Sequence, residues 1–187
     1  MEIKDVFSDM PMIETEKAIL RKMNITDAKD MFEYSSNKEV TKYLSYDHTS
    51  IEDAEKYMQN NVAKYAQGEC MIWGVEYKEN RKYIGACGFT HWDTENSCAE
   101  IAYTLTQSYW GKGIMSEIVD KLLEFGFEKM QLNRIEARCL SENDKSVRIM
   151  EKNNMKFEGV LREQIYSKGK HRDIKMYSIL KKEYQKK

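Results

Sequence analysis

The residues best suited to bind a ligand lie between a strand-like run and a helical pattern, within residues 107–118. Two glycines flank a lysine at this junction, Gly111-Lys112-Gly113. Glycine lets the backbone approach a ligand closely and adopt dihedral angles that other residues avoid. The following helix offers unpaired N–H groups and the positive end of its dipole. This combination predicts an anion site, usually for phosphate, although a G-x-G before a helix also occurs in ordinary tight turns.

The cysteines and histidines do not form a second reactive cluster. The cysteines include no C-x-x-C pair and fit no zinc-binding spacing; they are Cys70, Cys87, Cys98 and Cys139. Each lies in a strand-like run among apolar neighbours, so buried thiols are predicted rather than a catalytic nucleophile. The histidines are scattered without metal-site spacing; they are His48, His91 and His171. No metal site is predicted.

Composition narrows the classes of partner. The 30 basic and 31 acidic residues leave a net charge of −1, so no basic field favours nucleic acid or an anionic membrane. No run approaches the roughly 20 apolar residues of a membrane span, and the first residues lack the order of a signal peptide. A length of 187 residues fits one domain. We therefore expect a cytoplasmic protein with a single domain, residues 1–187 and a core of about 15–180.

The first part of the chain is predicted to be mainly helical. A lead-in, residues 1–15, holds the only proline, Pro11, and a first strand follows at 17–23. Thr26 is predicted to cap a helix that ends near Tyr34, with a further turn near 38–44. Ser50 opens a longer helix that Gly68 ends at about residue 67.

The remainder alternates between strands and helices. The predicted strands lie at 70–77, 82–90, 99–105 and 133–140, the helices at 114–129 and 144–153, a terminal hairpin at 156–166 and 171–180, and a solvated tail at 181–187. Short connections make the first three of these strands an antiparallel meander, and Asn154 is suited to a left-handed conformation after the second helix.

The order of these elements predicts a mixed α/β layer and not a doubly wound dinucleotide fold. The helix at 114–129 crosses over to the strand at 133–140, which should therefore lie parallel to the strand at 99–105. A ligand on the N-terminus of that helix would lie beside the C-terminal end of strand 99–105. A dinucleotide fold would instead carry its glycines near the first strand.

Three motifs resemble the GCN5-related N-acetyltransferases, and more narrowly the RimJ/RimL type that acetylates the N-termini of ribosomal proteins. They are Trp110-Gly-Lys-Gly113, Asn133-Arg-Ile-Glu-Ala-Arg138 and Asn143-x-x-Ser146-x-Arg148. The resemblance extends over about residues 15–180. It implies a central, mostly antiparallel sheet with helices on both faces and a splayed parallel strand pair, with acetyl-CoA as co-substrate and no metal.

The resemblance also implies contacts for acetyl-CoA. Pantetheine would pair with the main chain of Ile101, Ala102, Tyr103 and Leu105, as an added strand does. The pyrophosphate would rest on N–H groups of Trp110, Gly111, Lys112, Gly113, Ile114, Met115 and Ser116. Asn143 and Ser146 would contact pantetheine or the thiol, and Lys145, Arg148 and Lys152 the 3′-phosphate. A surface role for Lys112 and a solvated basic face for the second helix stay open. Ser108 departs from the family pattern, which favours Arg or Gln there.

Two residues are candidates for the chemistry. Glu100 on the central strand would accept the amine proton through a water; the alternative is a solvent-facing carboxylate. An N–H near Ala102 or Tyr103 would polarise the thioester carbonyl. Many family members place a tyrosine where this chain has Met150, which donates no proton. Ser146 would instead hydrogen-bond the leaving sulfur; its alternative is helix capping.

The leading hypothesis is transfer of an acetyl group from acetyl-CoA to the N-terminal Ala or Ser of a protein, plausibly ribosomal, by direct attack in a ternary complex. The alternatives are acetylation of a small-molecule amine or antibiotic, and a CoA-binding sensor without activity. The helices at 26–67 and the hairpin near 168–171 would shape the acceptor pocket, where Asp47 is too ordinary to assign. Exposed aromatic residues leave a homodimer open.

Overall fold

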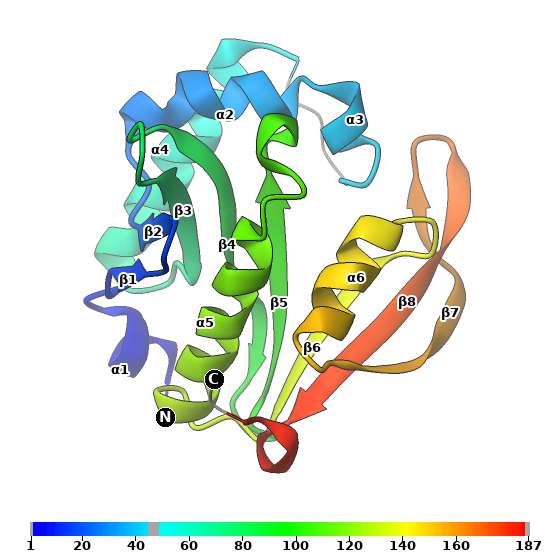
Figure 1. Cartoon of the computed structure of the whole chain (residues 1–187). Helices are drawn as coiled ribbons and strands as arrows, with labels where there is room; N and C mark the ends of the chain where they lie inside the picture. The colour runs from blue at the N-terminus through cyan, green and yellow to red at the C-terminus, as the bar shows by residue number, and fades with distance from the viewer. Residues whose placement is uncertain (1, 45–48, 186–187) are drawn as a thin grey trace. The chain divides into compact units, whose positions relative to one another are not determined.

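The computed structural model describes residues 2–44 and 49–185 (Figure 1). The chain forms two compact units. The first comprises Met1–Gly88 with Tyr103–Ile118, and the second comprises Phe89–Ala102 with Val119–Lys187. Two strands and one helix pass from one unit into the other, so each unit holds only part of them. His48 and Asp47 lie outside the described residues, as do residues 186–187.

The first unit begins with short elements and one long helix. Its complete elements are α1 (Ile3–Phe7), β1 (Ile13–Glu14), β2 (Ala18–Arg21), the 3-10 helix η1 (Ile25–Asp27), α2 (Ala28–Ser35), α3 (Lys38–Thr41), α4 (Ile51–Gln67), β3 (Ile72–Tyr77) and the 3-10 helix η2 (Gln107–Tyr109). It also holds the start of β4 (Tyr83–Asp93), the end of β5 (Cys98–Leu105) and the first turn of α5 (Ile114–Glu128).

The strands of the first unit are antiparallel neighbours. β1 pairs with β2, β2 with β3, and β3 with β4. The end of β5 lies against β4, where the Thr106 amide donates a hydrogen bond of 2.7 Å to the Ile84 carbonyl. The predicted meander is therefore confirmed for the β3–β4 pair.

Helix α4 begins and ends as its sequence predicts. The Ser50 side chain accepts a hydrogen bond from the Asp53 amide, and the Asp53 carboxylate accepts one from the Ser50 amide. These reciprocal bonds form a capping box, which satisfies N–H groups that have no partner within the helix. Gly68 ends the helix with a φ of 68°, in the left-handed region that glycine adopts without strain.

The N-terminal predictions need two corrections. Asn24, not Thr26, is the capping residue, because its side chain accepts a hydrogen bond from the Thr26 amide, and it caps the 3-10 helix η1 that leads directly into α2. The lead-in also contains α1 and β1, which the sequence analysis missed. β1 is only two residues long, so it carries no recognisable alternation of apolar and polar positions.

The second unit contains a strand–helix–hairpin arrangement. Its complete elements are β6 (Arg134–Leu140), α6 (Asp144–Lys152), β7 (Lys156–Ser167), β8 (Lys170–Leu180) and the 3-10 helix η3 (Lys181–Glu183). The predicted hairpin is confirmed, and its turn has a φ of 52° at Lys168 and 80° at Gly169. Asn154 has the predicted left-handed conformation, with a φ of 60°.

The parallel strand pair lies in the second unit. β5 and β6 are parallel and in register from Cys98 with Arg134 to Ile101 with Ala137. β8 pairs antiparallel with both β6 and β7. The order of all strands is β1-β2-β3-β4-β5-β6-β8-β7, so the predicted mixed sheet with a parallel pair is confirmed.

The C-terminal segment is not simply a solvated tail. η3 follows β8 directly, and the Lys156 ammonium lies 2.5 Å from the Glu183 carboxylate. The ring of Tyr184 lies 5.1 Å from that of Phe127, measured between centroids. These contacts attach the described part of the segment to its own unit.

The cysteines mostly follow their prediction. Cys70, Cys87 and Cys139 are buried, whereas Cys98 is partly exposed. Cys70 precedes β3 and does not lie within it, which corrects its assignment to a strand. Across residues 2–44 and 49–185, no helix is long and apolar enough to cross a membrane.

Candidate active site

The glycine loop in the first unit has the backbone geometry of an anion cradle. Gly111 and Gly113 have φ values of 76° and 80°. A Cβ atom added at Gly111 would meet nothing within 4 Å. Both glycines therefore serve an unusual backbone path, and the loop is open at Gly111, whereas an added Cβ at Gly113 would lie 3.8 Å from the Lys17 ammonium. The first turn of α5 follows at Ile114 and supplies N–H groups that helices leave unpaired.

The first part of the loop is held by its own contacts. The Trp110 amide donates a hydrogen bond of 3.0 Å to the Gln107 carbonyl, so the predicted contact of this N–H group with a phosphate is wrong. The Trp110 indole N–H donates a hydrogen bond of 2.8 Å to the Leu105 carbonyl at the end of β5. The Lys112 ammonium lies 4.9 Å from the centroid of the Tyr109 ring, a cation–π contact. Lys112 is thus directed onto an aromatic ring, and its contact with phosphate stays a prediction.

Lys17 is a residue at this loop that the sequence analysis missed. Its ammonium donates hydrogen bonds to the Glu117 carboxylate, at 2.9 Å, and to the Lys112 carbonyl, at 3.2 Å. The hydrogen bond with Glu117 raises the pKa of Lys17. The two residues of this ion pair are 100 positions apart in the chain. No local pattern could have revealed their contact.

Glu100 lies on β5 in the second unit and is held by two neighbours. The Arg138 Nε atom lies 3.1 Å from Glu100 Oε1, and the Glu100 side chain is 15% exposed. The Thr90 hydroxyl lies 3.4 Å from the same oxygen. The alternative of a freely solvated strand carboxylate does not fit this environment. Its role as a base stays a prediction.

β6 pairs with only the first part of β5. The parallel ladder ends at Ile101 with Ala137, yet β5 continues to Leu105 and β6 to Leu140. Past Ile101, β5 has main-chain groups on that side that the ladder does not use. Such groups can pair with an extended ligand as an added strand does.

The start of α6 excludes helix capping as the role of Ser146. Asn143 is the N-cap, and its side-chain oxygen accepts a hydrogen bond of 3.2 Å from the Ser146 amide. Ser146 is therefore three residues into the helix and does not cap it. Its hydroxyl hydrogen-bonds the Cys139 thiol, whose pKa burial raises to about 11. Met150 is fully buried and takes no part in a surface site.

The candidate residues are divided between the two units. The first unit holds Tyr103, Leu105 and the loop from Trp110 to Ser116. The second holds Glu100, Ile101, Ala102 and the α6 residues, of which Lys145 and Arg148 are exposed. In the described part of the chain, no group of three or more His, Cys, Asp or Glu residues could hold a metal ion.

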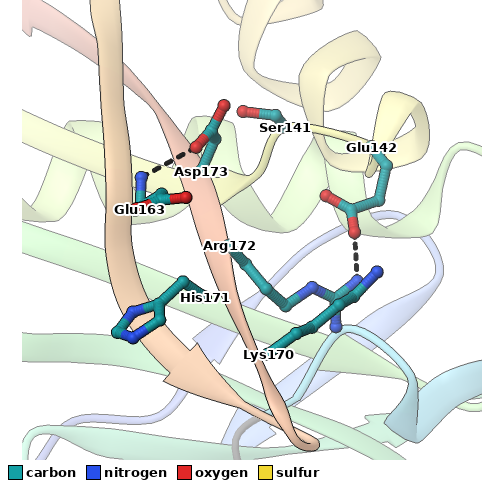
Figure 2. A pocket seen from close by; sticks show the side chains of 7 residues that line it. All are labelled: Ser141, Glu142, Glu163, Lys170, His171, Arg172 and Asp173. Atoms are coloured by element: carbon teal, nitrogen blue, oxygen red, sulfur yellow. Dashed lines mark hydrogen bonds and ion pairs between the residues drawn. The ribbon is translucent and has the colours of Figure 1, made fainter.

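A polar pocket of about 450 Å³ lies beside the terminal hairpin (Figure 2). Its lining residues come from the turn that follows β6 and from β7 and β8; they are Ser141, Glu142, Glu163, Lys170, His171, Arg172 and Asp173. Glu142 pairs with Arg172, and the Asp173 carboxylate accepts a hydrogen bond of 2.7 Å from the Glu163 amide. Glu163 has a φ of 51° within a β-bulge. The expectation of a pocket near the hairpin was general, and the sequence identified none of these contacts.

Comparison with known proteins shows the family. The acetyltransferase (GNAT) domain model matches residues 17–156, which include parts of both units. The chain therefore belongs to the GNAT acetyltransferases, and it is an N-acetyltransferase.

Individual relatives agree with this assignment. The chain is 39% identical to the uncharacterized N-acetyltransferase p20 of Bacillus licheniformis, over 94% of this chain and 99% of that protein. It is 28% identical to the ribosomal-protein-serine acetyltransferase of Escherichia coli, over 69% and 71% of the two chains.

Solved structures share the fold. A GNAT-family acetyltransferase from Bacillus anthracis has a TM-score of 0.83 and 29% identity, over 92% of this chain and 100% of that one. Structures with the same fold at 22% identity contain acetyl-CoA or coenzyme A. RimJ/RimL-type enzymes are thus among the relatives.

Proposed function

We propose that this N-acetyltransferase moves the acetyl group of acetyl-CoA to the N-terminal amine of a cytoplasmic protein that begins with Ala or Ser, such as a ribosomal protein. The observation that supports acetyl-CoA as the donor is the loop with left-handed backbone at Gly111 and Gly113, which is open at Gly111. Similarity to a ribosomal-protein-serine acetyltransferase supports the acceptor half.

The donor would be held mainly by main-chain groups. Its pyrophosphate would accept hydrogen bonds from the loop between Gly111 and Ser116, where the α5 dipole favours negative charge. Its pantetheine would pair with β5 beyond Ile101, where the ladder with β6 has ended. Lys145 and Arg148, both exposed on α6, would meet the 3′-phosphate.

The reaction is direct attack of the neutral amine on the thioester. A C–N bond forms, the C–S bond breaks, and the amine loses one proton to Glu100 through a water. An N-terminal amine has a pKa near 7.7–8, so a part of it is already neutral at physiological pH, and a modest base suffices. An N–H near Ala102 or Tyr103 would stabilise the developing oxyanion.

The leaving thiolate would be stabilised by a hydrogen bond and not by a strong acid. Ser146 carries the hydroxyl side chain of α6, and that hydroxyl also hydrogen-bonds the Cys139 thiol. A serine hydroxyl is a weak acid, so its contribution is a hydrogen bond to sulfur rather than full proton transfer. Coenzyme A can leave as a thiolate, so a hydrogen bond to its sulfur is sufficient and no strong acid is needed.

A small-molecule amine is the second candidate acceptor. A strongly cationic amine would need an acidic pocket. The hairpin pocket has three carboxylates, on Glu142, Glu163 and Asp173, but also two cationic side chains and a histidine. Figure 2 shows Glu142 directed at Arg172 and not into open space. The lining therefore does not favour a polycation over a peptide N-terminus.

A panel of acceptors tests this proposal. The wild-type protein is incubated with acetyl-CoA and peptides that begin with Ser, Ala or Lys, with a peptide whose N-terminus is blocked, and with polyamines and aminoglycosides. Mass spectrometry should detect one acetyl group on the Ser and Ala peptides only. Acetylation confined to the small amines would refute the acceptor assignment. Binding of acetyl-CoA with no acetylation of any acceptor would favour a sensor.

A homodimer stays a prediction. Phe157 and Tyr166 on β7 have exposed fractions of 53% and 68%, and β7 is the last strand in the sheet order.

A further inference from the structure

An ion pair between Lys17, which is distant in the sequence, and Glu117 in α5 lies against the glycine loop. Lys17 precedes β2, and its ammonium reaches both the Glu117 carboxylate and the Lys112 carbonyl. A Cβ atom added at Gly113 would lie 3.8 Å from the Lys17 ammonium and 4.0 Å from Glu117 Oε1. All of these residues belong to the first unit. The pair therefore sits beside the backbone that would receive a phosphate.

Glu117 poses an electrostatic problem for an anion at this place. It lies in the first turn of α5, where a carboxylate is itself favoured by the helix dipole. The same carboxylate would repel a pyrophosphate that uses the same N–H groups. Its second oxygen, Oε2, is buried and has no hydrogen-bond partner among the described residues. Lys17 is the cation that compensates this charge.

We propose that Lys17 is a positioning residue for the donor. Its ammonium neutralises Glu117 and holds the Lys112 carbonyl, so that the loop presents N–H groups, and no uncompensated negative charge, to the pyrophosphate. This inference rests on the proposed use of acetyl-CoA. It assigns Lys17 no direct contact with phosphate, since both of its observed bonds are to the protein.

The assignment predicts a specific pattern of loss and rescue. Lys17→Met leaves Glu117 as an unpaired, partly buried carboxylate beside the bound anion, so the Kd for coenzyme A should rise at least about tenfold. Glu117→Gln removes the repelling charge and should leave the Kd within about threefold of wild type. The double variant Lys17→Met/Glu117→Gln should recover most of the affinity that Lys17→Met loses.

Lys78→Met is the matched control. The Lys78 ammonium has the same kinds of partner, a carboxylate on Glu14 at 2.9 Å and the Thr15 carbonyl at 2.7 Å. Its side chain is 33% exposed and that of Lys17 is 36% exposed. Loss of this second pair should cost similar thermal stability without changing the Kd for coenzyme A.

The experiment measures coenzyme A binding by calorimetry for wild type, the three Lys17/Glu117 variants and Lys78→Met, with thermal unfolding of each. Turnover of acetyl-CoA is compared with that of S-acetylpantetheine, which lacks the pyrophosphate. The inference is supported if Lys17→Met weakens coenzyme A binding and acetyl-CoA turnover but not turnover of S-acetylpantetheine, and if adding Glu117→Gln restores both.

Three results would overturn the inference. A defect that Glu117→Gln does not rescue would make Lys17 a direct phosphate ligand. An equal loss with both donors would make its role structural, and an unchanged Kd would remove any role in donor binding. If wild type binds no coenzyme A, the proposed function itself fails, which separates that outcome from the other three.

Discussion

The glycine loop and the region around β5, β6 and the hairpin represent two ways of building a site. The glycine loop would recognise an anion through main-chain N–H groups from Gly111 onward, and its shape depends on two glycines. The second region depends on side chains from distant positions, such as Glu100 with Arg138 and Glu142 with Arg172. A donor that is common to a whole family is suited to recognition by backbone. Chemistry and acceptor choice depend on side chains, which vary freely on a fixed fold.

The contrast predicts different sensitivities to substitution. Main-chain recognition is lost only where the backbone path itself changes, as at a left-handed glycine. Side-chain recognition is lost with one functional group, while the fold remains. Two experiments test this difference, and a third tests what a side-chain ion pair contributes to stability.

The largest expected effect is at the side-chain region, on catalysis. Glu100→Gln keeps the size and polarity of the side chain but removes its capacity to accept the amine proton. We expect kcat to fall about 100-fold and the Kd for acetyl-CoA to stay unchanged. Steady-state kinetics with a Ser peptide and calorimetry measure the two quantities.

Glu136→Gln controls for the loss of an ion-paired strand carboxylate. Glu136 is the register partner of Glu100 on β6 and lies 2.7 Å from Arg134. Its substitution should leave kcat nearly unchanged. Equal losses of kcat in the two variants would remove Glu100 as the base.

The next effect is at the glycine loop, on donor affinity. Gly111→Ala places a side chain at a φ of 76°, which costs about 1–2 kcal/mol of backbone strain and shifts the loop away from its anion-binding shape. The KM for acetyl-CoA should rise about tenfold, equivalent to about 1.4 kcal/mol, with a smaller change in kcat.

Gly169→Ala in the hairpin turn is a close match for that substitution. Gly169 has a φ of 80°, and an added Cβ atom would likewise meet nothing within 4 Å. The two variants should lose similar thermal stability, but only Gly111→Ala should lose donor affinity. A rise in KM for both would mean that the loop glycines act through general stability.

The smallest effect concerns stability and its dependence on pH. Arg134 holds Glu158 with two bonds, of 2.6 and 2.8 Å, and this lowers the pKa of Glu158 from 4.5 to about 2. A carboxylate with a lowered pKa stabilises the folded state above its ordinary pKa, and the contribution is lost as pH falls through the lowered value.

Glu158→Gln should therefore lower the Tm at pH 7 and reduce the free energy of unfolding by about 1 kcal/mol at most, because the Arg134 and Glu158 side chains are 24% and 44% exposed. The difference from wild type should shrink below pH 4.5 and vanish near pH 2. Thermal unfolding at pH 7, 4 and 2.5 measures it. A difference that stays constant to pH 2.5 would exclude the ion pair as its cause.

Local sequence was sufficient where short-range bonds fix the backbone. The capping box of Ser50 with Asp53, the left-handed Gly68 and the hairpin turn at Gly169 join residues close together in the chain. The parallel pairing of β5 with β6 was also predictable, because a helix crossover leaves one favoured arrangement. The cap at Asn24 was missed because Thr26, two residues on, is an equally good capping residue type.

The sequence by itself determined the order of the main elements from β2 onward, the glycine loop at the start of α5, and the resemblance to an acetyltransferase family that the comparisons then showed. Only the tertiary structure placed Lys17 against Glu117, Arg138 against Glu100, and the side chains of the hairpin pocket. The physical reason is range. Backbone conformation follows from nearby residues, whereas an ion pair between positions 17 and 117 exists only once the strands and helices have packed.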